Sequence, residues 1–389
     1  MLSLTNISFK FDYTKNGDFM IKRYNYTILK ILIPIFVFMI ISILCIYSSS
    51  FLLPTSYNNL FIKQIIWYII GFIIIFLISN LKSDFFYRYS FVLYIIGNIF
   101  LILVLFFGTE SNGAKCWFTI PMIGSFQPSE FMKIILILVL SNYLNKHKDI
   151  KKTFKNELKI IFNCFILTLI PSFFIFLEPD TGIIFIFFMI LIVMLFVYGI
   201  RYRWFITLII IITLLSSAFL ILFFKYQDTF INIFGTKFFY RMDRLVDFKN
   251  GSGMQLTNAM AAVGSAGIFG HGFNKTPIYF PEPQTDFIFS IFASNFGFIA
   301  SLILILIILY FDLNILRIAM KCNFQNKLII SGILGMLLFG QIQNIGMNIG
   351  LMPITGITLP FISYGGSSLI SYMIIIGIIL NITKKETIY

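Results

Sequence analysis

Ten long apolar runs dominate this 389-residue sequence and constrain its fold more than any other feature. About 20 consecutive apolar residues cross a bilayer as an α-helix. The chain is 59% hydrophobic and 12% charged, whereas soluble domains are about half apolar and about a quarter charged. We therefore expect an all-α polytopic membrane protein of about ten transmembrane helices, without a soluble module. The runs lie near residues 28–48, 61–80, 88–108, 129–145, 159–177, 181–200, 204–224, 286–311, 327–346 and 366–383.

Basic residues concentrate in alternate loops between these runs. The formal net charge is +13, which in a soluble protein would suggest nucleic acid as a partner. Here the positive-inside rule accounts for it, because Lys and Arg accumulate in the cytoplasmic loops of membrane proteins. We expect no nucleic-acid partner, a multi-pass protein of the cytoplasmic membrane, and both termini in the cytoplasm. The predicted organisation is a cytoplasmic segment 1–26, a membrane domain 27–383 in contact with lipid, and a cytoplasmic tail 384–389.

The sequence carries few residues that suggest a metal site or a disulfide. The four Cys include no CxxC pair, and the two His, His147 and His271, fall in different loops. Neither a disulfide framework nor a zinc site is therefore indicated. The polar N-terminal segment runs directly into a membrane-spanning run, which indicates a retained signal anchor rather than a cleaved signal peptide.

The longest predicted outward loop, residues 225–285, carries candidate functional groups. A short helix followed by a Gly-rich turn is expected at 257–272. Arg241 and Arg244 are three residues apart and would form either a solvated helix face or a clamp for phosphate, which guanidinium binds well. Asp286, directly after the loop, is either an acid that caps a helix or a partly desolvated carboxylate able to act as general base.

A second candidate is the segment that opens the fourth run. Pro128 and Ser129 are typical of a helix start. Glu130 and Lys133 are spaced i, i+3 and therefore share a helix face. They form either a neutralised helix cap or, because polar residues at membrane depth are costly and usually functional, an ion pair that lines a polar cavity.

Two further segments interrupt the apolar runs. Asp180, within residues 178–182, either caps the helix that follows or belongs to a functional site. Residues 344–368 hold Gly, Pro and several hydroxyl side chains, and irregular backbone is tolerated in a membrane only where protein buries it or where it lines a cavity. We expect a polar groove near the outer surface that suits an anionic, lipid-linked substrate. On these grounds alone, transport and group transfer both stay open.

Three blocks together carry a resemblance. Gln127–Lys133, Pro281–Phe289 and Pro353–Ser368 are similar to the signature blocks of the SEDS family (shape, elongation, division and sporulation proteins, including RodA, FtsW and SpoVE), and the similarity runs from about Tyr26 to the C-terminus. Asn344–Gly356 resembles the RodA branch most closely. The resemblance implies ten helices with a large fourth extracellular loop, and a peptidoglycan glycosyltransferase that polymerises lipid II for cell elongation and shape. Lipid II is an undecaprenyl-diphosphate-linked disaccharide pentapeptide, and the implied protein partner is a class B penicillin-binding protein.

The resemblance also assigns roles to individual residues. It makes Asp286 the catalytic acid, acting as general base toward the acceptor hydroxyl, and places Glu130 and Lys133 in a central cavity. A divalent cation, Mg or Mn, could assist the diphosphate leaving group, although the sequence shows no dedicated metal cage; beyond that no cofactor is expected. The residues expected to bind substrate are Glu130, Lys133, Arg241, Arg244, Gln127, Ser129, Thr285, Ser363 and Ser367.

Three positions depart from the family pattern. Cys116 stands where the family usually has Arg, and Ser294 and Asn295 stand where it usually has two acids. These changes leave Asp286 in place but alter the charges expected around it.

Two other functions compete with the transferase interpretation. A lipid II flippase would fit a polar groove, but should carry polar residues deep in its spans and at their inner ends, whereas here they cluster at the outer ends. A non-catalytic scaffold that activates a penicillin-binding protein would fit the departures from the family pattern. The residues do not separate a role in elongation from one in division or sporulation.

Overall fold

The structure, a computed structural model, describes residues 13–54, 59–81, 84–111, 114–120, 124–236 and 253–386. Helices dominate, as predicted, and a small three-stranded antiparallel sheet in the order β1-β2-β3 was not expected. The helices are α1 (Tyr13–Ser49), α2 (Leu60–Ser79), α3 (Asp84–Arg88), α4 (Ser90–Phe107), α5 (Pro128–Lys146), α6 (Phe154–Leu177), α7 (Thr181–Tyr198), α8 (Tyr202–Lys225), α9 (Gln227–Phe234), α12 (Met254–Ser265), α13 (Ile288–Ala319), α14 (Phe324–Asn348) and α15 (Gly366–Glu386), with a 3-10 turn η1 (Ser50–Leu52) and strands β1 (Thr109–Ser111), β2 (Ala114–Ile120) and β3 (Gly124–Phe126).

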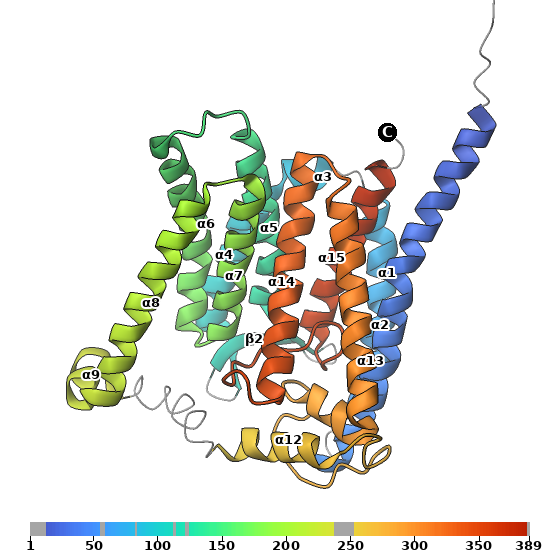
Figure 1. The fold of residues 1–389 in the computed structure, drawn as a ribbon, viewed down its shortest axis with the longest axis vertical. Helices are drawn as coiled ribbons and strands as arrows, with labels where there is room; N and C mark the ends of the chain where they lie inside the picture. Colours follow the sequence, from blue (N-terminus) through green and yellow to red (C-terminus); the bar gives the residue numbers. More distant parts are fainter. Residues whose placement is uncertain are drawn as a thin grey trace, which may run out of the picture.

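The long helices run roughly side by side in one bundle, and α1 begins at the same end of it as α15 finishes (Figure 1). Within the described residues, nine helices are long and apolar enough to cross a membrane. They coincide with nine of the ten predicted spans, and the tenth, 129–145, is α5. The prediction of a polytopic all-α membrane protein is thereby confirmed.

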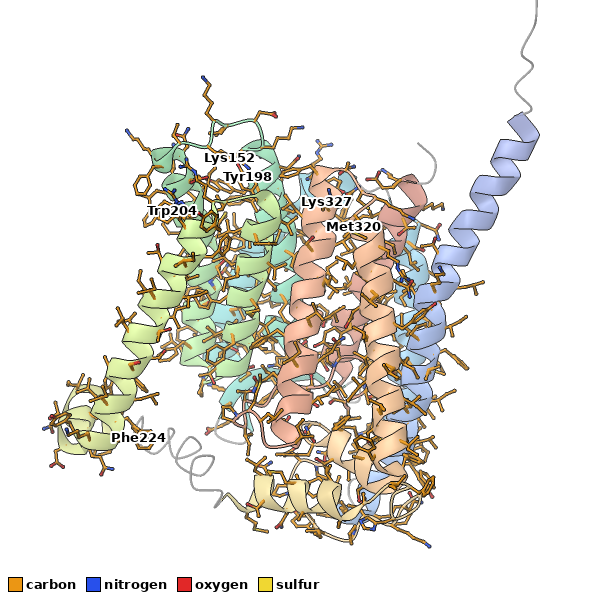
Figure 2. The ribbon with its side chains drawn as sticks, viewed as in Figure 1. Lys152, Tyr198, Trp204, Phe224, Met320 and Lys327 are labelled. Carbon is orange, nitrogen blue, oxygen red and sulfur yellow. The ribbon has the colours of Figure 1, made fainter. Side chains whose placement is uncertain are left out.

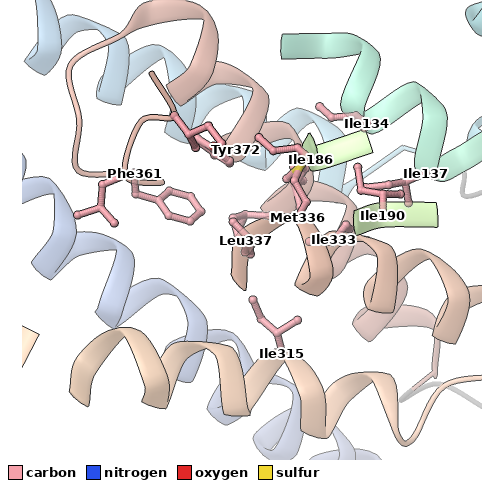
Figure 3. Packing of buried hydrophobic residues seen from close by; sticks show 14 of the residues in the cluster. Ile134, Ile137, Ile186, Ile190, Ile315, Ile333, Met336, Leu337, Phe361 and Tyr372 are labelled. Atoms are coloured by element: carbon pink, nitrogen blue, oxygen red, sulfur yellow. The ribbon is translucent and has the colours of Figure 1, made fainter. Parts of the chain in front are cut away.

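Helix α5 occupies the centre of the bundle, which explains how it can be more polar than the others. It contacts α4, α6, α7, α14 and α15. Figure 3 shows Ile137 of α5 beside Ile190 of α7 and Ile333 of α14, all buried. Because protein rather than lipid surrounds most of α5, its charged side chains are shielded from hydrocarbon.

Helix α8 behaves in the opposite way. It leans away from the bundle (Figure 1), and Phe223 is its one buried residue. It packs mainly against α9. Its exposed surface is mainly apolar, which suits contact with lipid.

The chain between α14 and α15 is irregular, and its second half, residues 357–363, is largely buried within protein. Gly356 and Phe361 both adopt positive φ, +73° and +65°. The Tyr68 hydroxyl of α2 donates to the Phe361 carbonyl, and the Asn344 side chain donates to the Ile357 carbonyl over 2.8 Å. Partners on neighbouring helices thus satisfy backbone groups that no helix satisfies, as a membrane protein requires.

A second irregularity divides α13. Gly297 has φ +78° and ψ −170°, and a Cβ there would lie 2.3 Å from the Gly270 nitrogen. The turn after α12, which is the predicted Gly-rich turn, crosses this break and bonds to it: the His271 N–H donates to the Ser294 carbonyl over 2.9 Å. Close backbone contact of this kind needs glycine on both sides.

Candidate active site

One polar cavity of about 570 Å³ lies at the end of the bundle that holds β2 and α12. The N-terminal turn of α5, the start of α7, the segment before α13 and the α14–α15 connection all line it. The structure therefore brings together segments that are far apart in the sequence. Six predicted site residues line this cavity: Gln127, Glu130, Lys133, Thr285, Asp286 and Ser367.

The other four predicted site residues are not among the described residues that line the cavity. Ser129 is fully buried and Ser363 is nearly so, and neither lines the cavity. Ser363 instead supports it from behind, because its hydroxyl donates to the Thr285 carbonyl over 2.6 Å. Arg241 and Arg244 lie outside the described residues, so the phosphate clamp stays a prediction.

The ion pair predicted on α5 is present and is buried. Lys133 Nζ lies 2.7 Å from Glu130 Oε2, and the lysine side chain is 1% exposed. The Ser371 hydroxyl of α15 donates to the same carboxylate oxygen over 3.2 Å, and the ammonium lies 5.1 Å from the centre of the Tyr372 ring. A buried pair needs such additional partners, because each charge loses its hydration.

Three consecutive backbone carbonyls hold Asp286 in position. The Tyr364 N–H donates to the Gln284 carbonyl over 2.9 Å, and Ser363 fixes the Thr285 carbonyl as described above. The Asp286 carbonyl accepts from two side chains of α14, Asn344 over 2.9 Å and Asn348 over 3.0 Å. The backbone that carries the carboxylate is therefore anchored at every residue, which is the preorganisation an active-site group requires.

The Asp286 side chain lies beside the irregular connection at Gly356. Its Oδ2 would lie 3.8 Å from a Cβ added at Gly356, a residue with φ +73°. Asp286 is not a helix cap, because α13 begins two residues later and Phe287 occupies the capping position. This removes the simple structural explanation for an acid at this point.

A hydrogen-bonded wall connects α5 to α7 and α15. Gln127 Nε2 donates to Asp180 Oδ2 over 2.8 Å, and the Gln127 N–H donates to the Ser367 hydroxyl over 3.1 Å. Burial, followed by the charge of Glu130, raises the pKa of Asp180 to about 6. Asp180 therefore takes part in the wall as a side-chain acceptor as well as preceding α7.

Cys116 and Glu178 lie together beside this wall. The Cys116 thiol donates to the Glu178 carbonyl over 3.2 Å. The Glu178 carboxyl is completely buried, and within the part of the chain that is described neither of its oxygens has a hydrogen-bond partner. Burial, followed by the charge of Asp180, raises the pKa of Glu178 to about 9. A neutral cysteine thus stands next to an acid that has no salt bridge in the described part of the chain.

Asn295 forms uncharged contacts at the break in α13, whereas the buried hydroxyl of Ser294 has no hydrogen-bond partner among the described residues. Asn295 donates to the Ser48 hydroxyl of α1 over 2.6 Å and accepts from the Thr276 hydroxyl over 3.2 Å. Both residues are almost fully buried. Hydrogen bonds between neutral groups therefore connect α1, α13 and the loop here without a buried charge to compensate.

The sequence interpretation missed several groups at this site. Tyr372 and Gln255 line the cavity and were not singled out. Asn344 and Asn348 were noticed only as part of a polar stretch. Their i, i+4 spacing, which places both amides on one helix face, is the signal that could have identified them as a pair acting on one target.

The acidic groups do not form a metal cage. Among the residues described, no three His, Cys, Asp or Glu side chains are close enough together to bind a metal ion. Glu130 and Asp180 already have the partners Lys133 and Gln127. A divalent cation at this site stays a prediction, because Mg²⁺ is usually held by one or two carboxylates together with substrate phosphates.

The relatives of this chain agree with its architecture. It is 32% identical to the probable peptidoglycan glycosyltransferase FtsW of Buchnera aphidicola (88% of this chain, 90% of the relative). It is 32% identical to stage V sporulation protein E of Bacillus subtilis (83% and 86%) and 30% identical to the peptidoglycan glycosyltransferase RodA of Treponema pallidum (89% and 95%).

Solved structures share the fold. A chain of a peptidoglycan synthase complex that coordinates polymerization and crosslinking matches with a TM-score of 0.75 at 24% identity, covering 92% of this chain and 97% of that one. The rod shape determining protein RodA of Thermus thermophilus matches with a TM-score of 0.66 at 25% identity and the same coverage. Residues 25–388 match the FtsW/RodA/SpoVE family of cell cycle proteins. The chain therefore belongs to this family.

Proposed function

We propose that this enzyme, a peptidoglycan glycosyltransferase, polymerises lipid II into glycan strands at the outer face of the cytoplasmic membrane. The observation that carries the proposal is the placement of Asp286 in the same cavity as the Glu130–Lys133 pair. A carboxylate and a cation in one polar cavity suit a reaction that removes a proton at one position and develops negative charge at another.

The proposed reaction is a displacement at the anomeric carbon of the donor sugar. The acceptor hydroxyl oxygen forms the new C–O bond while its proton passes to Asp286. The bond between the anomeric carbon and the diphosphate oxygen breaks, and its electron pair leaves with the diphosphate. A diphosphate is a good leaving group, so the reaction needs no strong general acid.

Lys133 contributes through its remaining N–H groups. One of its three ammonium protons is directed to Glu130, 2.7 Å away, and the side chain also lines the cavity. Glu130 fixes the ammonium and neutralises part of its charge. We propose that Lys133 donates hydrogen bonds to the diphosphate. Gln127, Thr285 and Ser367, which also line the cavity, would supply further polar contacts.

Asp286→Asn tests the assignment, because it preserves size while removing the basic carboxylate. We expect lipid II polymerisation by the purified protein, with its partner present, to fall about 10²–10⁴-fold, with thermal stability unchanged. Asp228→Asn, on exposed α9, is the matched control and should polymerise normally. Polymerisation by Asp286→Asn at the wild-type rate would show that Asp286 is not the base, and translocation of lipid II without polymer would favour a flippase.

We further propose a RodA-like role in elongation, with a class B penicillin-binding protein as partner. The relatives do not separate the branches, since FtsW, SpoVE and RodA proteins match at 30–32% identity. The support is the Asn344–Gly356 stretch, which resembles the RodA branch most closely. Asn344 and Asn348 of this stretch donate to the Asp286 carbonyl. Complementation of RodA-depleted but not FtsW-depleted cells tests the role, and rescue of division instead would assign the chain to the FtsW branch.

The proposed topology places both termini and the 147–153 loop in the cytoplasm and the 225–285 segment outside, within a membrane domain 27–383. The support is the bias of Lys and Arg toward alternate loops and the positive-inside rule. Labelling of single Cys residues introduced at exposed positions in these two loops, in intact cells with an impermeant reagent, tests it. Labelling at the 147–153 loop would show that the orientation is the reverse of the proposed one.

A further inference from the structure

A second cavity lies at the opposite end of the bundle from the active site. It has a volume of about 340 Å³ and lies between α4, α5 and α6. Its lining comes from the first turn of α4, the last turns of α5 and the middle of α6. Figure 2 places Lys152 and Tyr198 at this end of the molecule and Phe224 at the other.

The polarity of this cavity changes along the helix axes. On α5, the cavity is lined near the helix end by Lys146, Tyr143 and Asn142. Val139 lines the cavity about two turns deeper than Lys146. On α6 the order repeats: Asn163 is nearer the helix start, and Ile166 and Leu167 lie about one turn deeper. One end of the cavity is therefore polar and basic, and the end toward the membrane interior is apolar.

The cavity opens toward the lipid-facing surface. Phe91 of α4 lines it and is 59% exposed. Ile166, on its α6 side, is 36% exposed. Residues of this kind at membrane depth face acyl chains.

The polar end offers hydrogen-bond donors and positive charge. Asn163 Nδ2 donates to the Tyr143 hydroxyl over 2.7 Å, so the hydroxyl hydrogen is not used in that bond. Lys146 is exposed and forms no hydrogen bond or ion pair within the described segments. Lys159 lies one turn before Asn163 on the same face of α6. The loop between these helices adds further positive charge from Lys148, Lys151 and Lys152, and Lys155 follows in the first turn of α6.

We infer that this cavity binds an anionic phospholipid of the leaflet on the basic side of the bundle. The phosphate would accept from Lys146 and Tyr143, and one acyl chain would lie along Val139, Ile166 and Leu167. Basic pockets between transmembrane helices at the cytoplasmic side suit anionic headgroups. A volume of about 340 Å³ falls within the range of ligand pockets, about 300–1,000 Å³.

Such a lipid would connect three helices, one of which is central. Asn142 of α5 already donates to the Tyr87 carbonyl and to the Ser90 hydroxyl of α4, and the Tyr94 hydroxyl of α4 donates to the Leu167 carbonyl of α6. The lipid would add to these contacts on the side that faces the membrane. It would thereby stabilise α5, the helix that carries Glu130 and Lys133 at its other end.

Native mass spectrometry of the full-length protein with added phosphatidylglycerol or phosphatidylcholine tests the inference, together with thermal melting in the same lipids. We expect phosphatidylglycerol to bind more tightly and to raise the melting temperature. Lys146→Gln should weaken its binding about fivefold, as one lysine near an anionic headgroup implies. Lys148→Gln, two residues beyond Lys146 in the loop that follows α5 and outside the cavity lining, is the matched control and should bind as the wild type does.

Ile166→Trp provides an independent arm, because it fills the apolar end and leaves every lysine in place. We expect it to lose the stabilisation by phosphatidylglycerol while folding normally in detergent. Equal binding of the two lipids by the wild-type protein would overturn the inference. Equal weakening by Lys146→Gln and Lys148→Gln would also overturn it, because the attraction would then be diffuse surface charge rather than a site.

Discussion

Glu178 is a buried acid with no salt bridge among the described residues, and it should make the stability of the protein depend on pH. Its carboxyl is fully buried and its oxygens have no hydrogen-bond partner among the described residues. Burial, with the charge of Asp180, raises its pKa from 4.5 to about 9. The folded protein therefore keeps this proton at neutral pH, whereas the unfolded chain loses it above about pH 4.5.

The sign and size of the effect follow from linkage. Because the pKa is raised on folding, the stability contribution of this group is fully present below about pH 4.5 and declines until about pH 9. The loss is about 1.4 kcal/mol per pH unit, so at pH 7.5 it reaches about 4 kcal/mol as an upper bound. Glu178→Gln stays neutral at every pH and should remove this dependence.

Thermal melting of wild-type and Glu178→Gln protein from pH 5 to pH 8.5 tests the reasoning. We expect the variant to melt several degrees higher at pH 8 and the difference to shrink toward pH 5. Glu110→Gln, at an exposed position on β1, is the control and should follow the wild type throughout. A difference that is constant with pH would refute the reasoning, because the variant would then differ by packing and not by a proton.

Two further predictions concern the active-site framework. Glu130→Gln leaves Lys133 buried without its ion-pair partner and should lower the free energy of unfolding by about 3–5 kcal/mol. The double variant Glu130→Gln with Lys133→Met should recover part of this loss in the same thermal melts. A double variant less stable than Glu130→Gln alone would contradict the prediction. Asn348→Ala removes a donor to the Asp286 carbonyl and an acceptor for Ser290. We expect a fall of about tenfold or more in the polymerisation rate with lipid II binding retained, and an unchanged rate would show that Asn344 alone positions Asp286.

The spans were predictable because the thickness of the bilayer imposes a length on each apolar run. The positions of helices relative to one another were not. The run that became α8 is as apolar as its neighbours, and nothing within it indicates that it would lie apart from the bundle. The strands at 109–126 were also missed, because they are short and pair only with one another.

The site was predictable where it contains charged residues, because these are costly at membrane depth and are usually functional. Glu130, Lys133 and Asp286 are charged residues at the ends of apolar runs, and all three line the cavity. Serines carry no such signal, because a hydroxyl that contacts a substrate and one that supports a backbone carbonyl have the same chemistry. Ser367 and Ser363, four residues apart, illustrate the two outcomes: the first lines the cavity and the second lies behind it.

The central position of α5 has a consequence for biogenesis. This helix is absent from the set apolar enough to cross a membrane by composition, and its first two turns carry Glu130 and Lys133. It therefore enters the bilayer poorly on its own. During synthesis α4 precedes it and α6 and α7 follow it, and all three contact it in the finished bundle. We expect the insertion machinery to retain α5 until these neighbours emerge, so that the active-site helix is released into the membrane as part of a group.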